Sequence, residues 1–358
     1  MIQKKERNYG IDLLRIVSMM MVVLLHVLGA GGLLDTTFGI NNKIVWLLEV
    51  FAFCAVNCYA LISGYVGVNS KFKLSNILIL WLQVFIYNFV FYFIFLVLGK
   101  LTFSFDVLKE MLFPVLSKRY WYFTAYFALF FMMPLLNFII NKFPKKKLKN
   151  ILIIGFILFS ILPTVFNNDV FQMHGGYSLH WLIYLYLVGG FIYKYNCFCK
   201  LSKLKLLFIY FCSGLFSWLS RFGFIYLSRY YGRFYNLKSL FINYLSPTIF
   251  IAALCLLVLF LKMNLCNWRR IISFFSPVSF GVYLIHVQPI FFEGVWSGKF
   301  KLFSNVNIIL LIIIILFSTF SVYLLCSLID WIRLKIFSFF KVKEKLLSLE
   351  NKYFTKLF

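Results

Sequence analysis

Charged residues are scarce in this sequence of 358 residues, of which only 13% are Asp, Glu, Lys or Arg. A water-soluble domain carries about 25% charged residues, because its surface must be hydrated. The shortage therefore excludes a soluble globular domain as the main part of the chain. The hydrophobic share of 63%, with 47 phenylalanines, 22 tyrosines and 8 tryptophans, instead predicts an integral membrane protein in contact with the lipid bilayer.

Acidic residues are rarer still, since 11 Asp and Glu stand against 36 Lys and Arg for a net charge of +25. Such an excess is typical of nucleic-acid-binding proteins, but Lys and Arg also accumulate in the cytoplasmic loops of membrane proteins. With the N-terminus in the cytoplasm, the predicted cytoplasmic segments hold 24 basic residues and the outer segments hold 10. The charge therefore predicts a topology with both termini cytoplasmic, and we expect no nucleic-acid partner.

The sequence also lacks the spacings of a metal site. Cys197 and Cys199 form a CxC pair, but no histidine or second cysteine pair lies nearby. We expect no metal, and we interpret the eight cysteines as packing residues or reduced thiols. A cleaved signal peptide is not expected either, because the first apolar run (11–34) is too long and contains Arg15.

Long apolar runs dominate the rest of the sequence. A helix that spans a bilayer needs about 20 mainly apolar residues. Ten stretches qualify: residues 11–34, 44–68, 75–98, 121–142, 150–166, 179–195, 205–227, 240–262, 270–292 and 305–332. The predicted fold is therefore an all-α bundle of about ten transmembrane helices. It forms a single domain over residues 1–340, followed by a short basic cytoplasmic tail over 341–358.

The first predicted span carries three ionisable residues, Asp12, Arg15 and His26. Such groups are costly inside a membrane and are candidates for function. Arg15 and His26 are eleven residues apart, which places them on one helix face about 16 Å apart along the axis, and Asp12 can pair with Arg15. Asp12 and Arg15 also lie near the membrane interface, where charged residues can serve only to anchor a helix. His26 lies deeper, and it is either a functional residue or a structural histidine whose hydrogen bonds are made within the bundle.

Two more ionisable residues fall at a similar depth. His286 lies about six residues from the outer end of the ninth span and Glu49 about five from that of the second, against about eight for His26 in the first. Two imidazoles and a carboxylate at one level form a possible acid–base centre, because histidine titrates near neutrality and a carboxylate can orient it.

Four segments of the chain, in this order, resemble the membrane acyltransferase 3 family. They are the lead-in YGIDLLR whose arginine is followed by ten residues and then a histidine, ISGY in the second span, WY at 121–122, and SFGVYLIH at 279–286. The resemblance covers roughly residues 10–335. Members without an additional extracytoplasmic domain resemble bacterial O-acetyltransferases of capsule, lipopolysaccharide and other surface glycans.

The resemblance implies a multi-pass protein of the bacterial plasma membrane that moves an acetyl group from cytoplasmic acetyl-CoA, its donor substrate, to a hydroxyl of a cell-surface polysaccharide or its lipid-linked precursor. No bound cofactor is implied. His26 and Arg15 would be catalytic, with Glu49 and His286 as partners. Donor or acceptor binding would fall to Asp12, Ser63, Gly64, Trp121, Tyr122 and Tyr283.

Some of these residues also fit a purely structural role. The Ser63–Gly64 pair suits close helix packing, and the RYWYFTAY segment at 119–126 suits an interfacial anchor. Two other functions also fit a many-span protein of a glycan pathway: a polymerase, and a flippase or transporter. The sequence specifies neither the acceptor sugar, nor the acyl group, nor the oligomeric state.

Overall fold

The computed structural model describes residues 7–198 and 200–353, so Cys199 of the CxC pair and the end of the predicted tail lie outside the described residues. All regular secondary structure in these ranges is helical, with no strand. Its α-helices are α1 (Tyr9–Leu28), α2 (Leu33–Thr36), α3 (Gly39–Ala52), α4 (Ala55–Gly67), α5 (Leu74–Val97), α6 (Phe105–Leu112), α7 (Trp121–Lys142), α8 (Lys145–Phe156), α9 (Leu162–Phe166), α10 (Leu179–Tyr195), α11 (Lys203–Tyr231), α12 (Pro247–Leu261), α13 (Arg269–His286), α14 (Pro289–Phe291), α15 (Ile308–Phe339) and α16 (Val342–Tyr353).

All ten predicted spans lie on helices, but some of these helices are by themselves too short or too polar to cross a membrane. Seven helices in the described ranges are long and apolar enough to cross a membrane, or up to eight if α12 and α13 count together as one bent span. Those two meet at an angle of 93°, and α12 and α10 contain only 15 and 17 residues. The structure therefore supports a membrane protein, while the exact number of ten spans stays a prediction.

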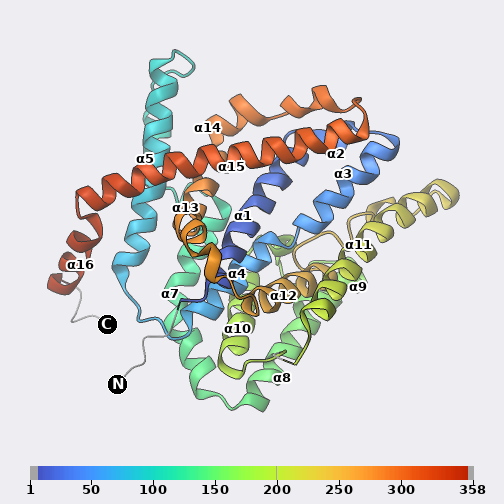
Figure 1. Cartoon of the computed structure of the whole chain (residues 1–358), viewed down its shortest axis with the longest axis horizontal. Coiled ribbons are helices and arrows are strands. Elements are labelled where there is room, and N and C mark those ends of the chain that lie inside the picture. The colour runs from blue at the N-terminus through green and yellow to red at the C-terminus, as the bar shows by residue number, and fades with distance from the viewer. Residues whose placement is uncertain (1–6, 199, 354–358) are drawn as a thin grey trace.

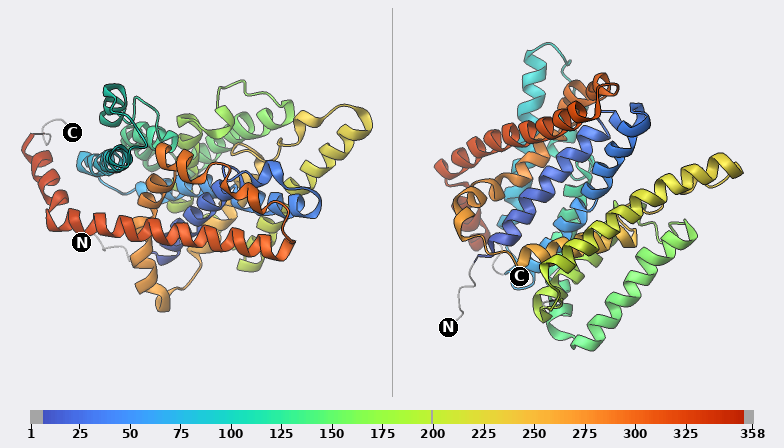
Figure 2. Two further views of the ribbon diagram at one scale, coloured as in Figure 1. Left: turned by 90° about the horizontal axis from the view of Figure 1, so that it is seen from above. Right: turned by 45° about the vertical axis from the view of Figure 1, so that its right-hand side comes forward.

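Helix α1 lies in the middle of the bundle (Figure 1). It packs against α13, α15, α4, α12 and α3. In its most apolar stretch 56% is buried inside the protein, compared with 22% for α15. The long helix α15 crosses one face of the molecule, as the two further views show (Figure 2). Because neighbouring helices surround α1, its polar side chains meet protein or an internal cavity in place of lipid.

Helices α4 and α10 pack closely against each other. A Cβ atom added to Gly64 would lie 2.0 Å from the carbonyl oxygen of Tyr186, and one added to Gly189 would lie 2.1 Å from that of Leu61. Small residues allow helix backbones to approach in this way within membranes. The two glycines therefore fix the position of α4, whose residues Val56 and Tyr59 line the cavity described below.

A buried acid, Asp330, joins α15 to α5. It accepts hydrogen bonds from Gln83 (2.9 Å) and Tyr87 (2.6 Å) and pairs with Arg333 at 2.7 Å. Because Gly281 has no side chain, α13 also lies directly against this carboxylate. The network satisfies a charge that is otherwise costly inside a membrane, and it holds α13, which carries His286, in place.

Candidate functional site

A cavity of about 240 Å³ lies beside the C-terminal half of α1. Its polar side chains include those of His26 and Glu49, and half of its lining residues are Phe, Tyr or Trp. Eight aromatic residues line it: Phe53, Tyr59, Trp121, Tyr122, Tyr177, Tyr244, Phe280 and Tyr283. Ligand pockets are typically lined in this way, by apolar and aromatic groups around a few polar ones.

The two histidines that the sequence places at one depth are in contact. Nδ1 of His26 lies 2.9 Å from Nε2 of His286, and the ring centres are 5.0 Å apart. His286 is fully buried, whereas His26 lines the cavity. The pair therefore has one inner member, which meets only protein, and one outer member, which a substrate in the cavity can reach.

The position of each proton in this pair follows from a third group. Nδ1 of His286 lies 2.6 Å from the backbone carbonyl oxygen of Val282, which can only accept a hydrogen bond. Nδ1 of His286 therefore carries a proton, and in the neutral ring Nε2 is the acceptor. Nδ1 of His26 must then donate to it, and Nε2 of His26 is left with a free lone pair. Such a lone pair can act as a base or a nucleophile.

The segment that follows α13 covers the outer imidazole. Phe292 sets the edge of its ring against His26, with ring centres 5.7 Å apart. Further on, the backbone N–H of Gly298 donates to Ala30 (2.9 Å) and that of Phe300 donates to Gly31 (3.1 Å). The segment is thus fixed to the C-terminal end of α1 and fills the space between that end and the surroundings of the protein.

Glu49 brings the third predicted ionisable group to the same cavity. It is 6% exposed, and its Oε2 atom has no hydrogen-bond partner among the residues that the structure describes. A buried carboxylate oxygen is normally hydrogen-bonded. The free acceptor therefore indicates a place where a ligand can donate a hydrogen bond.

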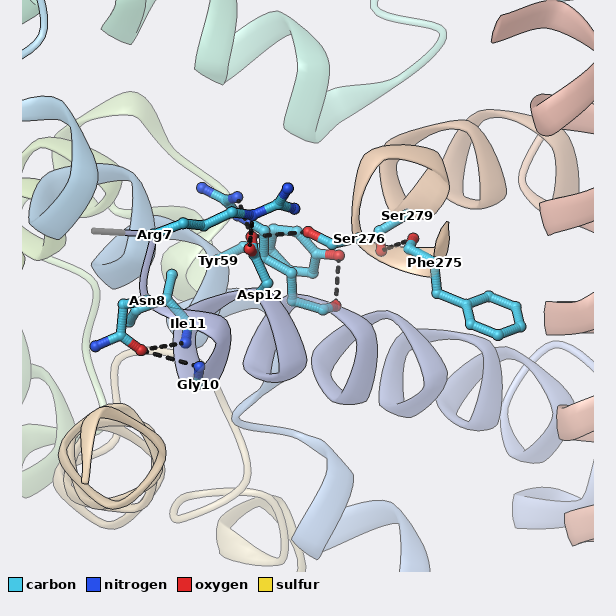
Figure 3. A network of polar contacts seen from close by, with 10 residues as sticks. Arg7, Asn8, Gly10, Ile11, Asp12, Tyr59, Phe275, Ser276 and Ser279 are labelled. Carbon is cyan, nitrogen blue, oxygen red and sulfur yellow. Dashed lines mark hydrogen bonds and ion pairs between the residues drawn. The ribbon is translucent and has the colours of Figure 1, made fainter. Parts of the chain in front are cut away.

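The first turns of α1 form a second polar centre (Figure 3). The carboxylate of Asp12 is buried and pairs with Arg15 at 3.0 Å and with Arg7, and it also accepts a hydrogen bond from Ser276 at 2.9 Å. Two guanidinium groups share one carboxylate, so this end of α1 keeps an excess of positive charge. The side chain of Arg15 is 32% exposed, which leaves it accessible to an anion.

Tyr59 connects the two centres. Its hydroxyl donates to the backbone carbonyl of Arg15 at 2.8 Å, while its ring lines the cavity. The sequence did not single out this residue, although it lies one helical turn before Ser63. Tyr177 and Tyr244 were missed as well. Tyr177 lies in the loop before α10, where periodicity gives no signal, and Tyr244 falls within the predicted span 240–262 although in the structure it precedes α12.

The remaining predicted site residues divide into two groups. Trp121, Tyr122 and Tyr283 line the cavity. Ser63 and Gly64 are absent from its lining: the Ser63 hydroxyl donates to the carbonyl of Tyr59 at 2.9 Å, and Gly64 packs against α10. These contacts give Ser63 and Gly64 a packing role, and substrate binding by them stays a prediction.

Comparison with known proteins gives one family. The family model described as an acyltransferase domain, acyltransferase 3, matches residues 8–331. The match includes Asp12, Arg15, His26 and His286, begins one residue after Arg7 and ends within α15. No curated protein and no solved structure matches the chain.

Proposed function

Because the chain belongs to the acyltransferase 3 family and is a membrane acyltransferase, we propose that it transfers an acetyl group from cytoplasmic acetyl-CoA to a hydroxyl of a cell-surface polysaccharide or of its lipid-linked precursor. The observation that carries this proposal is the free Nε2 lone pair of His26 at the wall of the cavity. In this proposal the protein lies in the bacterial plasma membrane with both termini in the cytoplasm.

His26 acts as the general base. Its Nε2 atom takes the proton of the acceptor hydroxyl while the hydroxyl oxygen attacks the thioester carbonyl carbon. The carbon–sulfur bond then breaks, and the CoA sulfur leaves with the proton that His26 returns. His286 orients the ring and stabilises the positive charge that His26 carries between the two proton transfers.

The arginines at the start of α1 bind the donor. A guanidinium binds phosphate oxygens at two points. Arg15 places such a group about 16 Å from His26 along α1, and Arg7 lies beside it on the shared carboxylate of Asp12. An extended pantetheine arm bridges a separation of this size. The phosphates then stay at the cytoplasmic end of the helix while the thioester reaches the cavity.

The acceptor enters from the opposite side. Tyr177 lines the cavity and is 48% exposed, so the cavity meets the surface there. Residue 177 lies between the predicted fifth and sixth spans, on the predicted outer side. Donor and acceptor therefore approach one imidazole from the two faces of the membrane, which favours acyl transfer over polymerisation or transport.

The test is glycan analysis of a strain in which His26→Ala replaces the wild-type protein. We expect loss of O-acetyl groups with normal chain length and normal export. His180→Ala provides the matched control, because His180 is exposed and lies outside this cavity, and it should leave O-acetylation intact. Short or missing chains in the His26→Ala strain would point to a polymerase or a transporter instead.

The same lone pair also permits a covalent route, in which Nε2 of His26 attacks the thioester and an acetyl-histidine forms before the sugar hydroxyl displaces it. Incubation with labelled acetyl-CoA, without glycan, distinguishes the two routes. Label retained on the peptide that contains His26, and absent from the His26→Ala protein, would establish the covalent route, whereas an unlabelled peptide would leave His26 as a base.

A further inference from the structure

A buried guanidinium on α11 lies against α3, with two of its nitrogens lacking a hydrogen-bond partner among the described residues. Arg221 of α11 is 7% exposed, and its guanidinium carbon lies 3.2 Å from the ring centre of Trp46 on α3. Its Nε and Nη1 atoms have no hydrogen-bond partner in the described part of the chain, and no described acid lies within the 4.0 Å of an ion pair. A buried charge without a partner is costly, so an occupant that satisfies it is expected.

Two neighbouring residues also have a buried polar atom that lacks a hydrogen-bond partner in the described part of the chain. Among the described residues, neither Nε1 of Trp46 nor Oε2 of Glu49 has a hydrogen-bond partner, and both atoms are buried. Trp46 and Glu49 are three residues apart on α3, which puts them on the same face of the helix. We name Arg221, Trp46 and Glu49 the Arg221 cluster. It contains three unused donor groups and one unused acceptor, and Glu49 connects it directly to the cavity that contains His26.

The chemistry of the cluster defines its ligand. A guanidinium binds a carboxylate or a phosphate at two points, while a carboxylate such as Glu49 accepts from a hydroxyl. A neutral sugar would satisfy Glu49 and leave Arg221 unpaired. The phosphates of the donor would not pair with Arg221, because in the proposed function they bind Arg7 and Arg15 at the other end of α1.

We propose that the Arg221 cluster binds an anionic sugar unit of the acceptor, one that carries a carboxylate or a phosphate group. Arg221 holds the anion, and Glu49 accepts a hydrogen bond from a hydroxyl of the same unit. The inference rests on the proposed function, whose acceptor class it specifies. The competing explanation is an internal one, in which Arg221 serves only as a counter-charge that balances Glu49.

The experiment measures binding to the purified full-length protein in detergent, without acetyl-CoA. The probes are the p-nitrophenyl β-glucoside, β-glucuronide and 6-phospho-β-glucoside, which are neutral, carboxylated and phosphorylated versions of one sugar. A charge-assisted contact contributes about 1.5–3 kcal/mol, so we expect an anionic probe to bind at least about 10-fold more tightly than the glucoside. Whichever anionic probe binds more tightly identifies the group.

Arg221→Gln should abolish this preference, and Arg229→Gln, which changes an exposed arginine of the same helix, should keep it. Equal binding of all three probes by the wild-type protein would overturn the proposal, and so would a preference that survives Arg221→Gln. If Arg221→Gln fails to fold, Arg221→Lys replaces it: a weaker preference supports the proposal, and an unchanged one overturns it. Because acetyl-CoA is absent, this result does not depend on the His26→Ala glycan analysis.

Discussion

At the scale of single residues, the central feature is the chain of contacts from Val282 through His286 to His26. Each contact determines the next, because a carbonyl oxygen that can only accept a hydrogen bond fixes the proton of His286, and His286 fixes that of His26. His286 is therefore a positioning residue: it touches no substrate, yet it decides which nitrogen of His26 is free.

This dependence predicts different outcomes for two substitutions of His286. His286→Leu removes the acceptor for Nδ1 of His26 and should lower kcat by about 10- to 100-fold with little change in KM for acetyl-CoA, because general acid–base catalysis contributes about 10² to 10⁴ in total. His286→Gln offers a side-chain oxygen at a similar distance and should recover part of the loss. Steady-state acetyl transfer in membranes measures both variants.

The two substitutions of His286 also test whether this residue only fills space. A protein in which His286 only fills space would tolerate Leu better than Gln, since the site is buried and apolar. Equal activity of the two variants, or higher activity of His286→Leu, would contradict the positioning role.

At the scale of helices, the position of the site depends on how closely α4 and α10 approach. Gly64→Ala would place a methyl group 2.0 Å from the carbonyl oxygen of Tyr186, and overpacking of this kind costs about 1–3 kcal/mol. We expect a lower melting temperature and a lower yield of folded protein for this variant in detergent.

Gly223→Ala is the matched control, because nothing lies within 4 Å of a Cβ atom at that position on α11. Alanine is favoured over glycine in a helix by about 1 kcal/mol, so this variant should melt at the wild-type temperature or slightly above. Two variants with the same melting temperature would show that the helices separate easily, against the packing described above.

The last helix offers a contact that depends on pH. Glu350 of α16 accepts hydrogen bonds from the backbone N–H groups of Leu74 (2.7 Å) and Ser75 (3.1 Å) at the start of α5. Partial burial raises the pKa of Glu350, but the hydrogen bonds from Ser75 and Leu74 outweigh it and hold the pKa below its usual value. The ionised carboxylate is therefore the form that binds α5.

A lowered pKa in the folded state means that this contact stabilises the docked helix above the pKa of the free carboxyl group, about 4.3, and that the stabilisation is lost as the pH falls through the lower, folded value. Hydrogen exchange of residues 342–353 measures it. Glu350→Gln should exchange faster than wild type at pH 7, and the difference should shrink below about pH 4. A difference that persists in acid would exclude the carboxylate as its cause.

At the scale of the whole molecule, the sequence located the helices but not their mutual geometry. Runs of about 20 apolar residues predicted ten helical stretches, and each of them is helical over most of its length, although the stretch 44–68 is divided between α3 and α4. The bend of 93° between α12 and α13 gave no such signal, because a short polar break between two apolar runs also fits a simple turn.

The candidate site was likewise predictable only in part. Counting residues from the span ends brought His26 and His286 to one level, since depth along a helix follows from its rise per residue. The contact of Arg221 with Trp46 was not predictable, because it depends on how α11 and α3 are rotated towards each other, and many distant contacts decide that rotation.

The carbonyl of Val282 has one more consequence. A backbone oxygen takes up no proton at any physiological pH, so the row of imidazoles that ends on it has a closed end. In the proposed reaction, the proton that His26 takes from the acceptor hydroxyl therefore has no exit through His286 and must leave on the CoA sulfur. The enzyme would acylate across the membrane without conducting free protons along its imidazoles, because each proton taken up by His26 leaves bound to the thiol product.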